Sequence, residues 1–196
     1  VKLNSAGYEL ANTIKRLVPD AIDSRRKIFY YITKAKVDPN TGFPPPRYNP
    51  KFKPISANQL TAAELEAANA IEKSFNRFAE VFGRGDDKLF SNIRTNYLPL
   101  IWAQYNPAKQ PFQFISRFDE QITGPSGKFA FGKRGVFGDI DKGLQKNYSI
   151  KPGYDDPVEL IKIYSHAAGK ALATRALITN LERTKINNRA LLTRLK

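Results

Sequence analysis

The sequence predicts a mainly α-helical fold, an irregular bundle of about five to seven helices with an extended Pro-rich arm and Gly-rich connecting loops. Three observations predict it. Apolar residues recur at helical spacing in several long segments, helix-start signals precede two of these segments, and most prolines and glycines lie between them. With 196 residues, 41% of them hydrophobic, the chain is long enough to bury a sizeable core.

Residues 1–36 are expected to form an N-terminal helical hairpin. The apolar face of the first helix, over residues 5–17, is formed by Leu10, Ile14 and Leu17. Pro19 ends this helix, because a proline ring clashes with the preceding helical turn. A second helix, over residues 20–36, turns three apolar residues inward: Ile22, Phe29 and Ile32. It turns its basic run outward: Arg25, Arg26 and Lys27.

Residues 37–59 are expected to form a Pro-rich extended arm. Asp38 to Gly42 is a turn sequence, and three successive prolines favour the polyproline II conformation: Pro44, Pro45 and Pro46. Pro50 and Pro54 exclude a continuous helix. At about 20 residues the arm exceeds the usual length of a connection. We favour an arm that lies on its own domain; the alternative is an arm that clasps a neighbouring molecule.

Residues 60–196 are expected to form a helical domain, and its first helix has a clear start signal. Thr61 and Glu64 have the spacing of a capping box, in which each side chain accepts a hydrogen bond from a free backbone N–H group. The helix that follows ends at Gly83-Arg84-Gly85. Its inward stripe consists of Leu65, Ala68, Ile71, Phe75, Phe78 and Phe82.

The second start signal opens the longest helix of this domain. Asp156 is the expected N-cap, Pro157 occupies the first helical position and Glu159 the third. One face of this helix is lined by Leu160, Tyr164, Ala167, Ala171, Thr174, Ile178 and Leu181. The small residues from Ala167 to Ala171 would let another helix approach closely.

The pattern between these two helices is weaker. A short helix is expected from Asp86 to Ile93, followed by a buried extended segment from Tyr97 to Trp102, which Pro99 keeps out of the middle of a sheet. Gln113 to Glu120 indicates one or two further helical turns. The Gly-rich stretches from Gly124 to Gly135 indicate loops.

The chain is strongly basic, with 32 Lys and Arg residues against 18 Asp and Glu residues and a net charge of +14. Such a charge attracts polyanions, whether nucleic acid, an anionic membrane or an acidic protein surface. The candidate nucleic-acid or anion-binding residues are Arg25, Arg26, Lys27, Lys128, Lys133, Arg134, Arg183, Lys185, Arg189 and Arg194. In the glycine loop we favour solvated charges over phosphate binding. In the C-terminal helix both interpretations stay open.

No sequence motif for catalysis is present. The glycines from Gly132 to Gly138 match neither the dinucleotide fingerprint nor the phosphate loop. The acid pairs lack the spacing of a metal site, His166 has no second histidine, and the chain contains no Cys. Ser126 does not lie in a nucleophile elbow. We therefore predict no enzyme, no cofactor and no metal site within this chain, and no apolar run is long enough for a membrane span.

Five motifs follow one another along the chain: Leu60 to Leu65, Asn96 to Trp102, Gly127 to Arg134, Gly143-Leu144 and Asp156 to Leu160. Taken in this order, they resemble a segment of the large polyvalent, virion-associated proteins of tailed bacteriophages, very long chains that are packaged and delivered with the genome. The likeness covers roughly residues 37–183. Leu98 and Leu100 depart from the aromatic and His-like residues of that segment. The resemblance implies a particle protein and carries over no catalytic residue.

The sequence therefore predicts a structural and assembly module of a larger bacteriophage protein, located in the virion. It is expected to pack against copies of itself or neighbouring virion proteins, near packaged DNA. The start at Val1 and the lack of Met fit an internal segment of a longer polypeptide. The expected protein contacts are Pro44, Pro45, Pro46, Tyr97 and Trp102. Two alternatives are a non-specific nucleic-acid-binding module and a non-catalytic accessory domain of a giant virion enzyme.

Overall fold

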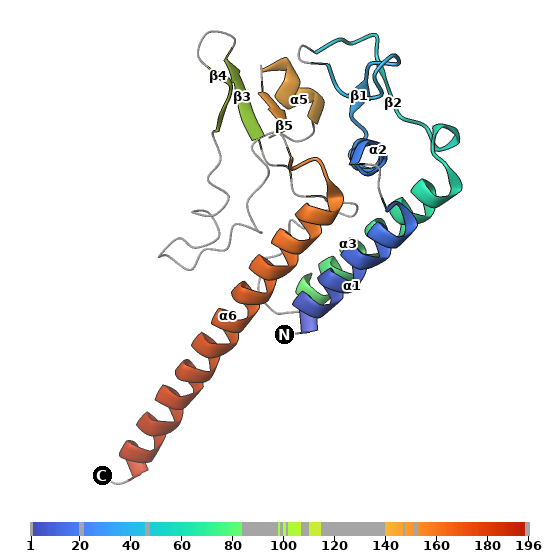
Figure 1. Ribbon diagram of the computed structural model, residues 1–196. Coiled ribbons are helices and arrows are strands. Elements are labelled where there is room, and N and C mark those ends of the chain that lie inside the picture. Colours follow the sequence, from blue (N-terminus) through green and yellow to red (C-terminus); the bar gives the residue numbers. More distant parts are fainter. Residues whose placement is uncertain are drawn as a thin grey trace.

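The fold is mainly α-helical, as predicted, with 65% of the described residues in helices and 7% in strands (Figure 1). The computed structural model describes residues 2–19, 22–45, 48–83, 98, 100, 102–106, 110–114, 140–146, 148–150 and 153–194. Within these ranges the helices are α1 (Lys2–Leu17), α2 (Ile22–Ile32), the short 3-10 helix η1 (Ala57–Gln59), α3 (Ala62–Gly83), α5 (Ile140–Gln145) and α6 (Pro157–Arg194). The strands are β1 (Lys36–Val37), β2 (Lys53–Pro54), β3 (Trp102–Asn106), β4 (Gln110–Phe114) and β5 (Tyr148–Ile150).

Helix α1 ends before Pro19, as expected, but α2 is shorter than the sequence suggests. It ends at Ile32 because Lys34 adopts a left-handed backbone conformation, with a φ of 54°, which no helix continues through. Phe29 and Ile32 are buried as predicted, whereas the prediction that Ile22 points inward is wrong, since its side chain is 58% exposed. In Figure 1 α2 is seen end-on, so it crosses α1 instead of lying alongside it as in a helical hairpin.

The described part of the Pro-rich arm contacts the body of its own chain. Strands β1 and β2 pair antiparallel, so the arm folds back at its base. Val37, in β1, and Ile55, which follows β2, are both buried. Farther out, the ring of Phe43 packs edge-on against Tyr30 of α2, with 6.1 Å between the ring centroids.

Three short strands form a sheet that the sequence did not predict, in the order β4-β3-β5 and antiparallel throughout. Trp102 begins the central strand, so the prediction that this segment stays out of the middle of a sheet is wrong at its last residue. Leu98 is buried, in agreement with the predicted burial of the segment. The helical turn expected from Gln113 is also wrong at Gln113 and Phe114, which lie in β4 opposite Gln104 and Ala103.

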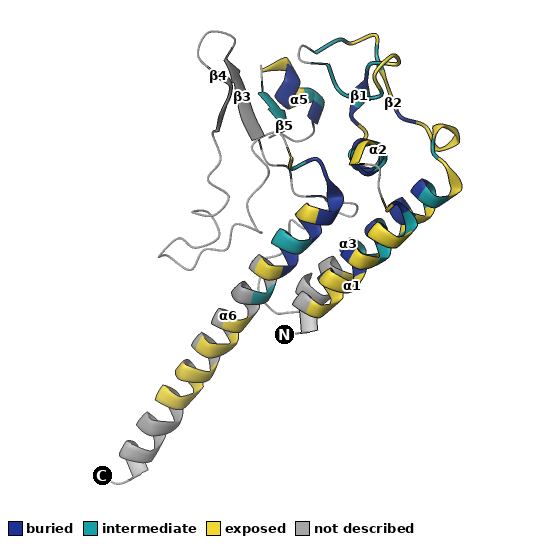
Figure 2. Ribbon diagram, in the orientation of Figure 1, coloured by how far each residue is buried: buried dark blue, intermediate teal, exposed yellow. Residues whose placement is uncertain are grey.

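One hydrophobic core joins the N-terminal helices, the base of the arm and the first turns of α6. Its largest fully buried side chains include Phe29 of α2, Ile71 of α3 and Leu160 of α6. Helix α1 packs along α6, while α3 packs against both α1 and α2. The second half of α6 projects away from this body, and its described side chains are exposed (Figures 1 and 2).

The packing of α1 on α6 is closest at Gly7. A Cβ atom added there would lie only 2.3 Å from Cβ of Ser165, so the absence of a side chain at Gly7 allows the contact. The sequence predicted a close approach at the small residues from Ala167 to Ala171, whereas the observed contact is at Ser165, two residues before them. Among the described residues, no helix is both long and apolar enough to cross a membrane.

Candidate functional site

A cluster of buried ion pairs joins α2 to the start of α6. Arg25 Nε donates a hydrogen bond to Asp156 Oδ2 at 3.0 Å. Arg26 Nε donates to Asp155 Oδ2 at 2.6 Å, and the Tyr30 hydroxyl donates to the same oxygen at 2.8 Å. These contacts connect residues more than a hundred positions apart in the sequence and place the first turn of α6 against α2.

The basic run of α2 is therefore not a solvent-facing patch. The side chain of Arg25 is 11% exposed and that of its partner Asp156 is 13% exposed, so the prediction that Arg25 points outward is wrong. Arg26 is 32% exposed and pairs with a carboxylate that is almost fully buried. Lys27 Nζ donates to Glu64 Oε2 of α3 at 3.2 Å. Each of the three cations thus faces an acid on another element.

Asp156 has two structural roles. Its Oδ1 atom accepts a hydrogen bond from the backbone N–H of Val158 at 2.9 Å, which confirms the predicted N-cap of α6. Its other oxygen binds Arg25, and Arg25 Nη1 also donates to the carbonyl oxygen of Pro19 at 3.1 Å. Arg25 therefore ties the end of α1 and the start of α6 to α2.

The electrostatics of the cluster favour fixed protonation states. Burial raises the pKa of Tyr30, and the adjacent Asp155 carboxylate raises it further, so the hydroxyl remains a hydrogen-bond donor. Burial opposes the charge of Arg26, but its hydrogen bond and ion pair with Asp155 outweigh that effect and raise its pKa. Arg26 therefore stays charged and Tyr30 stays protonated, so both keep their hydrogen bonds to Asp155 and hold α2 against the start of α6.

A cavity of about 570 Å³ lies beside this cluster, within the size range of small-molecule sites. Its apolar wall is formed by Ile22, Pro44, Pro45, Ile140, Leu144 and Ile150. Arg26, Tyr30 and Asp155 border it, and they are already bonded to one another. Ser149 also lines the cavity, and its Oγ atom is buried without a hydrogen-bond partner among the described residues. The sequence contains no signal for this cavity, because its walls come from segments far apart in the chain.

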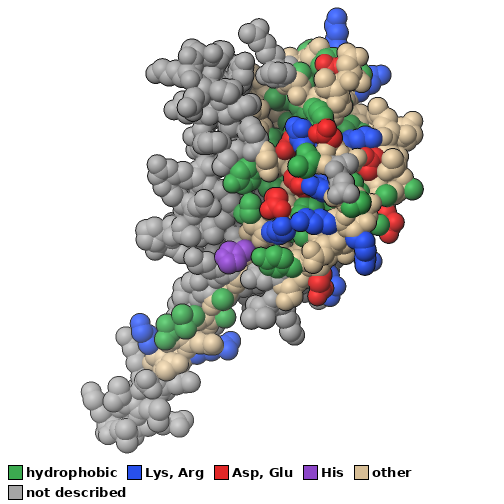
Figure 3. All heavy atoms as spheres, in the orientation of Figure 1, with side chains coloured by type: hydrophobic (Ala, Val, Ile, Leu, Met, Phe, Trp, Pro, Cys, Tyr) green, Lys and Arg blue, Asp and Glu red, His purple; other side chains and the backbone are tan. Residues whose placement is uncertain are grey.

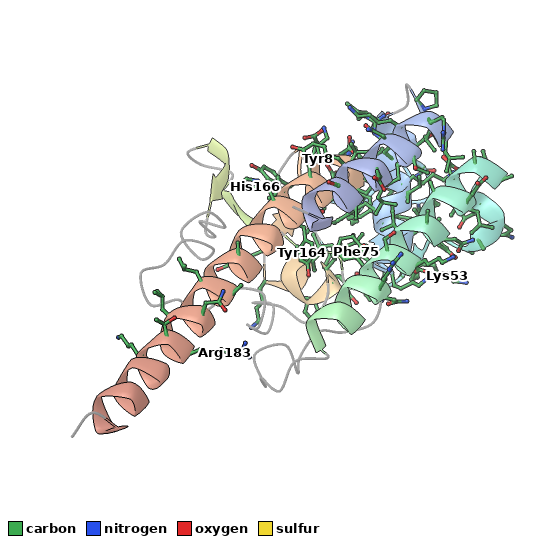
Figure 4. The ribbon with its side chains drawn as sticks, turned by 90° about the horizontal axis from the view of Figure 1, so that it is seen from below. Tyr8, Lys53, Phe75, Tyr164, His166 and Arg183 are labelled. Carbon is green, nitrogen blue, oxygen red and sulfur yellow. The ribbon has the colours of Figure 1, made fainter. Side chains whose placement is uncertain are left out.

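No reactive constellation is visible within the described ranges. No group of three or more His, Cys, Asp or Glu side chains there lies in an arrangement that could hold a metal ion. His166 is exposed on α6, near Tyr8 of α1 (Figure 4). The acid residues of the cluster serve as ion-pair partners and helix caps.

The structure does not bring the predicted basic candidates together at one site. Arg25, Arg26 and Lys27 lie in the ion-pair cluster. Arg183 (Figure 4) and Lys185 are exposed on the projecting part of α6. The remaining basic candidates lie outside the described side chains: Lys128, Lys133, Arg134, Arg189 and Arg194. The same holds for the predicted contacts Pro46, Tyr97 and the side chain of Trp102, and for the helix expected from Asp86 to Ile93.

Comparison with known proteins identified no relative. No family model matches the chain, and neither does any curated protein or solved structure. The resemblance to virion proteins therefore depends on the sequence motifs alone. Two of those motifs start helices as their sequences predict, the capping box of Thr61 and Glu64 before α3 and the Asp156-Pro157 start of α6.

Proposed function

We propose that this chain is a structural and assembly module of a larger bacteriophage virion protein. In this role it packs against neighbouring virion proteins or against copies of itself and carries out no catalysis. The observation that carries the proposal is α6, a helix of 38 residues whose first turns are fixed to the body and whose second half projects from it. A fixed, protruding helix is suited to attachment.

The base of α6 is held firmly enough to support such a projection. Asp155 and Asp156 bind Arg26 and Arg25, and Val158, Leu160 and Ile161 are fully buried. At a rise of about 1.5 Å per residue the whole helix is roughly 57 Å long, so its outer half extends well beyond the core. A long helix gains little stability from propensity alone, which favours a partner along the projecting part.

The Pro-rich arm is a weaker candidate for the attachment surface than its sequence suggested. Pro44 and Pro45 line a cavity of their own domain and are partly buried. An arm that lies on its own core has less surface to offer a neighbour. The proposal therefore depends on α6 and not on the arm.

A second candidate function is non-specific nucleic-acid binding, and the exposure of Arg183 and Lys185 on α6 favours it. Cations on a projecting helix would follow a phosphate backbone, with an affinity that falls steeply as salt rises. A salt titration of duplex-DNA binding tests it: absence of binding at low ionic strength removes this candidate. An accessory role in a giant virion enzyme is a third hypothesis, which the sequence on either side of this chain would decide.

Mass spectrometry of purified phage particles, followed by cross-linking within them, tests the structural role. We expect peptides of this chain in the particle at a fixed ratio to the other structural proteins. Cross-links should join lysines of α6, such as Lys185, to neighbouring proteins or to a second copy. Absence of the chain from purified particles would refute the proposal, as would substrate turnover that depends on residues of this chain.

A further inference from the structure

The projecting part of α6 exposes two kinds of side chain side by side. Leu177 is 60% exposed and Leu181 54% exposed, and at a spacing of four residues they lie on the same face of the helix. Lys185, four residues after Leu181, lies on the same face and is exposed as well, whereas Arg183 is exposed on the opposite side of the helix. On the face shown in Figure 3, the described charged side chains of this part are all basic.

Leu181 belongs to a longer apolar pattern that serves as a packing surface nearer the base of the helix, and Leu177 lies one turn before it. The residues from Leu160 through Tyr164, Ala167, Ala171, Thr174 and Ile178 to Leu181 are spaced alternately by four and three positions, which is the spacing of a helix-packing seam. At the base of α6 this seam is covered. Leu160 is buried, and the ring of Tyr164 packs against that of Phe75 in α3, with 5.1 Å between the ring centroids (Figure 4). At Leu181 the same seam is exposed.

The charge of this segment decides what kind of partner fits it. From residue 170 to residue 194 the chain has six Lys and Arg residues and a single acid, Glu182. A second copy of the same helix would bring like charges together, which is unfavourable. Nucleic acid would satisfy the cations but leave the leucines without an apolar partner. The basic residues are distributed around the helix, which does not suit a helix lying on an anionic membrane.

We propose that the projecting part of α6 binds an acidic amphipathic helix of a neighbouring protein. The apolar face of that helix covers Leu177 and Leu181, and its carboxylates face Lys185 at the edge of this surface. A single partner provides both the apolar cover and the carboxylates when it is an amphipathic helix with an apolar face flanked by acidic residues. This inference rests on the proposed function for the identity of the neighbour as a particle protein, whereas the surface itself is a property of this chain.

The test uses the purified 196-residue chain and a fluorescent designed peptide of about four heptads, with Leu at the seam positions and Glu on both flanks. A control peptide has the same length and charge, but Ser replaces Leu at the seam. Fluorescence anisotropy at about physiological salt measures both affinities. We expect the Leu peptide to bind at least about tenfold more tightly than the Ser peptide, because it buries the two exposed leucines.

Variants of the chain locate the site. Leu177→Ser with Leu181→Ser should weaken binding of the Leu peptide at least about tenfold and remove its advantage over the Ser peptide. Lys185→Glu, on the leucine face, should weaken both peptides more than Arg183→Glu on the opposite side. The matched controls are Tyr8→Ser, an exposed apolar residue on α1, and Lys53→Glu, an exposed cation on the arm, and neither should change binding. Because all substituted residues are exposed, circular dichroism should show unchanged folding.

Equal affinity for the two peptides would overturn the proposal, because it would show attraction by charge alone. Unchanged binding by the double Leu variant would overturn it as well. Tighter binding to duplex DNA, to phosphatidylserine vesicles or to a second copy, abolished by the same leucine substitutions, would assign the surface to that partner instead. None of these outcomes affects whether the chain is found in particles, so the two proposals fail independently.

Discussion

Replacing Gly7 by Ala is expected to destabilise the fold, although Ala is the better helix former. Gly7 lies in α1, where α1 crosses Ser165 of α6. The new Cβ atom would lie 1.8 Å from Oγ and 2.3 Å from Cβ of Ser165, whereas non-bonded carbon atoms are normally about 3.5–4.0 Å apart. Ser165 is 1% exposed, so it has no solvent-filled space to move into. The two helices would have to separate.

The expected cost follows from two opposing effects. Overpacking a filled interior costs about 1–3 kcal/mol, and an overlap of more than 1 Å with two atoms places this case at the upper end. The gain in helix propensity from Gly to Ala is about 1 kcal/mol. The net loss in the free energy of unfolding is therefore about 2 kcal/mol. For a chain of this size that corresponds to a fall in Tm of about 4–8 °C.

Urea and thermal unfolding followed by circular dichroism measure this change. The matched control is Asn12→Ala, at an exposed position of the same helix, where the propensity gain should appear without a steric cost. Ser165→Gly removes both overlapping atoms, so Gly7→Ala should cost at least about 1 kcal/mol less in that background. The reasoning is refuted if Gly7→Ala is as stable as the unsubstituted chain, or if the two substitutions are additive.

Two further predictions concern the buried acids. Asp156→Ala should lower stability by about 3–5 kcal/mol, because it leaves the Arg25 guanidinium buried without its carboxylate and removes the cap of α6; Asp156→Asn keeps the cap and should cost about 1 kcal/mol less. If urea unfolding shows that Asp156→Ala and Asp156→Asn lower the free energy of unfolding equally, Asp156 does not act as both cap and ion-pair partner. Burial disfavours the Glu64 carboxylate, but hydrogen bonds from Thr61, Ser24 and Lys27 outweigh it and lower its pKa below the ordinary 4.5. The stability advantage over Glu64→Gln should therefore be full above about pH 4.5 and shrink as the pH falls through the lowered pKa; a pH-independent difference would contradict this.

The parts of the fold that sequence analysis predicted correctly are those determined by local signals. The Thr61 and Glu64 capping box and the Asp156-Pro157 start each depend on residues within one helical turn, and both helices begin where predicted. The predicted end of α2 was wrong because Lys34 adopts a left-handed backbone conformation. A lysine gives no sequence signal for that conformation, which glycine usually adopts. The pairing of β3 with β5 was missed because it joins residues more than forty positions apart, such as Trp102 with Ile150. The pairing of β3 with β4 is local, and it was missed because Gln113 and Phe114 were assigned to a helical turn.

The candidate site was harder to predict than the fold, because each half of it had a sufficient local explanation. A run of three basic residues on a helix is usually solvated, and an acid pair before a helix is usually a cap. Asp156 is indeed a cap, yet its second carboxylate oxygen binds Arg25, and neither sequence segment contains information about the other. Only the packing of α2 against the first turn of α6 brings the two charges together.

This pairing changes what the net charge of the chain implies about partners. Arg25, Arg26 and Lys27 are bound by acids within the body, so they contribute little to attraction at the surface. Among the basic candidates whose side chains the structure describes, the exposed ones are Arg183 and Lys185, on the helix that projects. Whatever anionic surface this chain meets, charge reversal on α6 should therefore weaken the interaction, whereas changes at Arg26 should act mainly through stability.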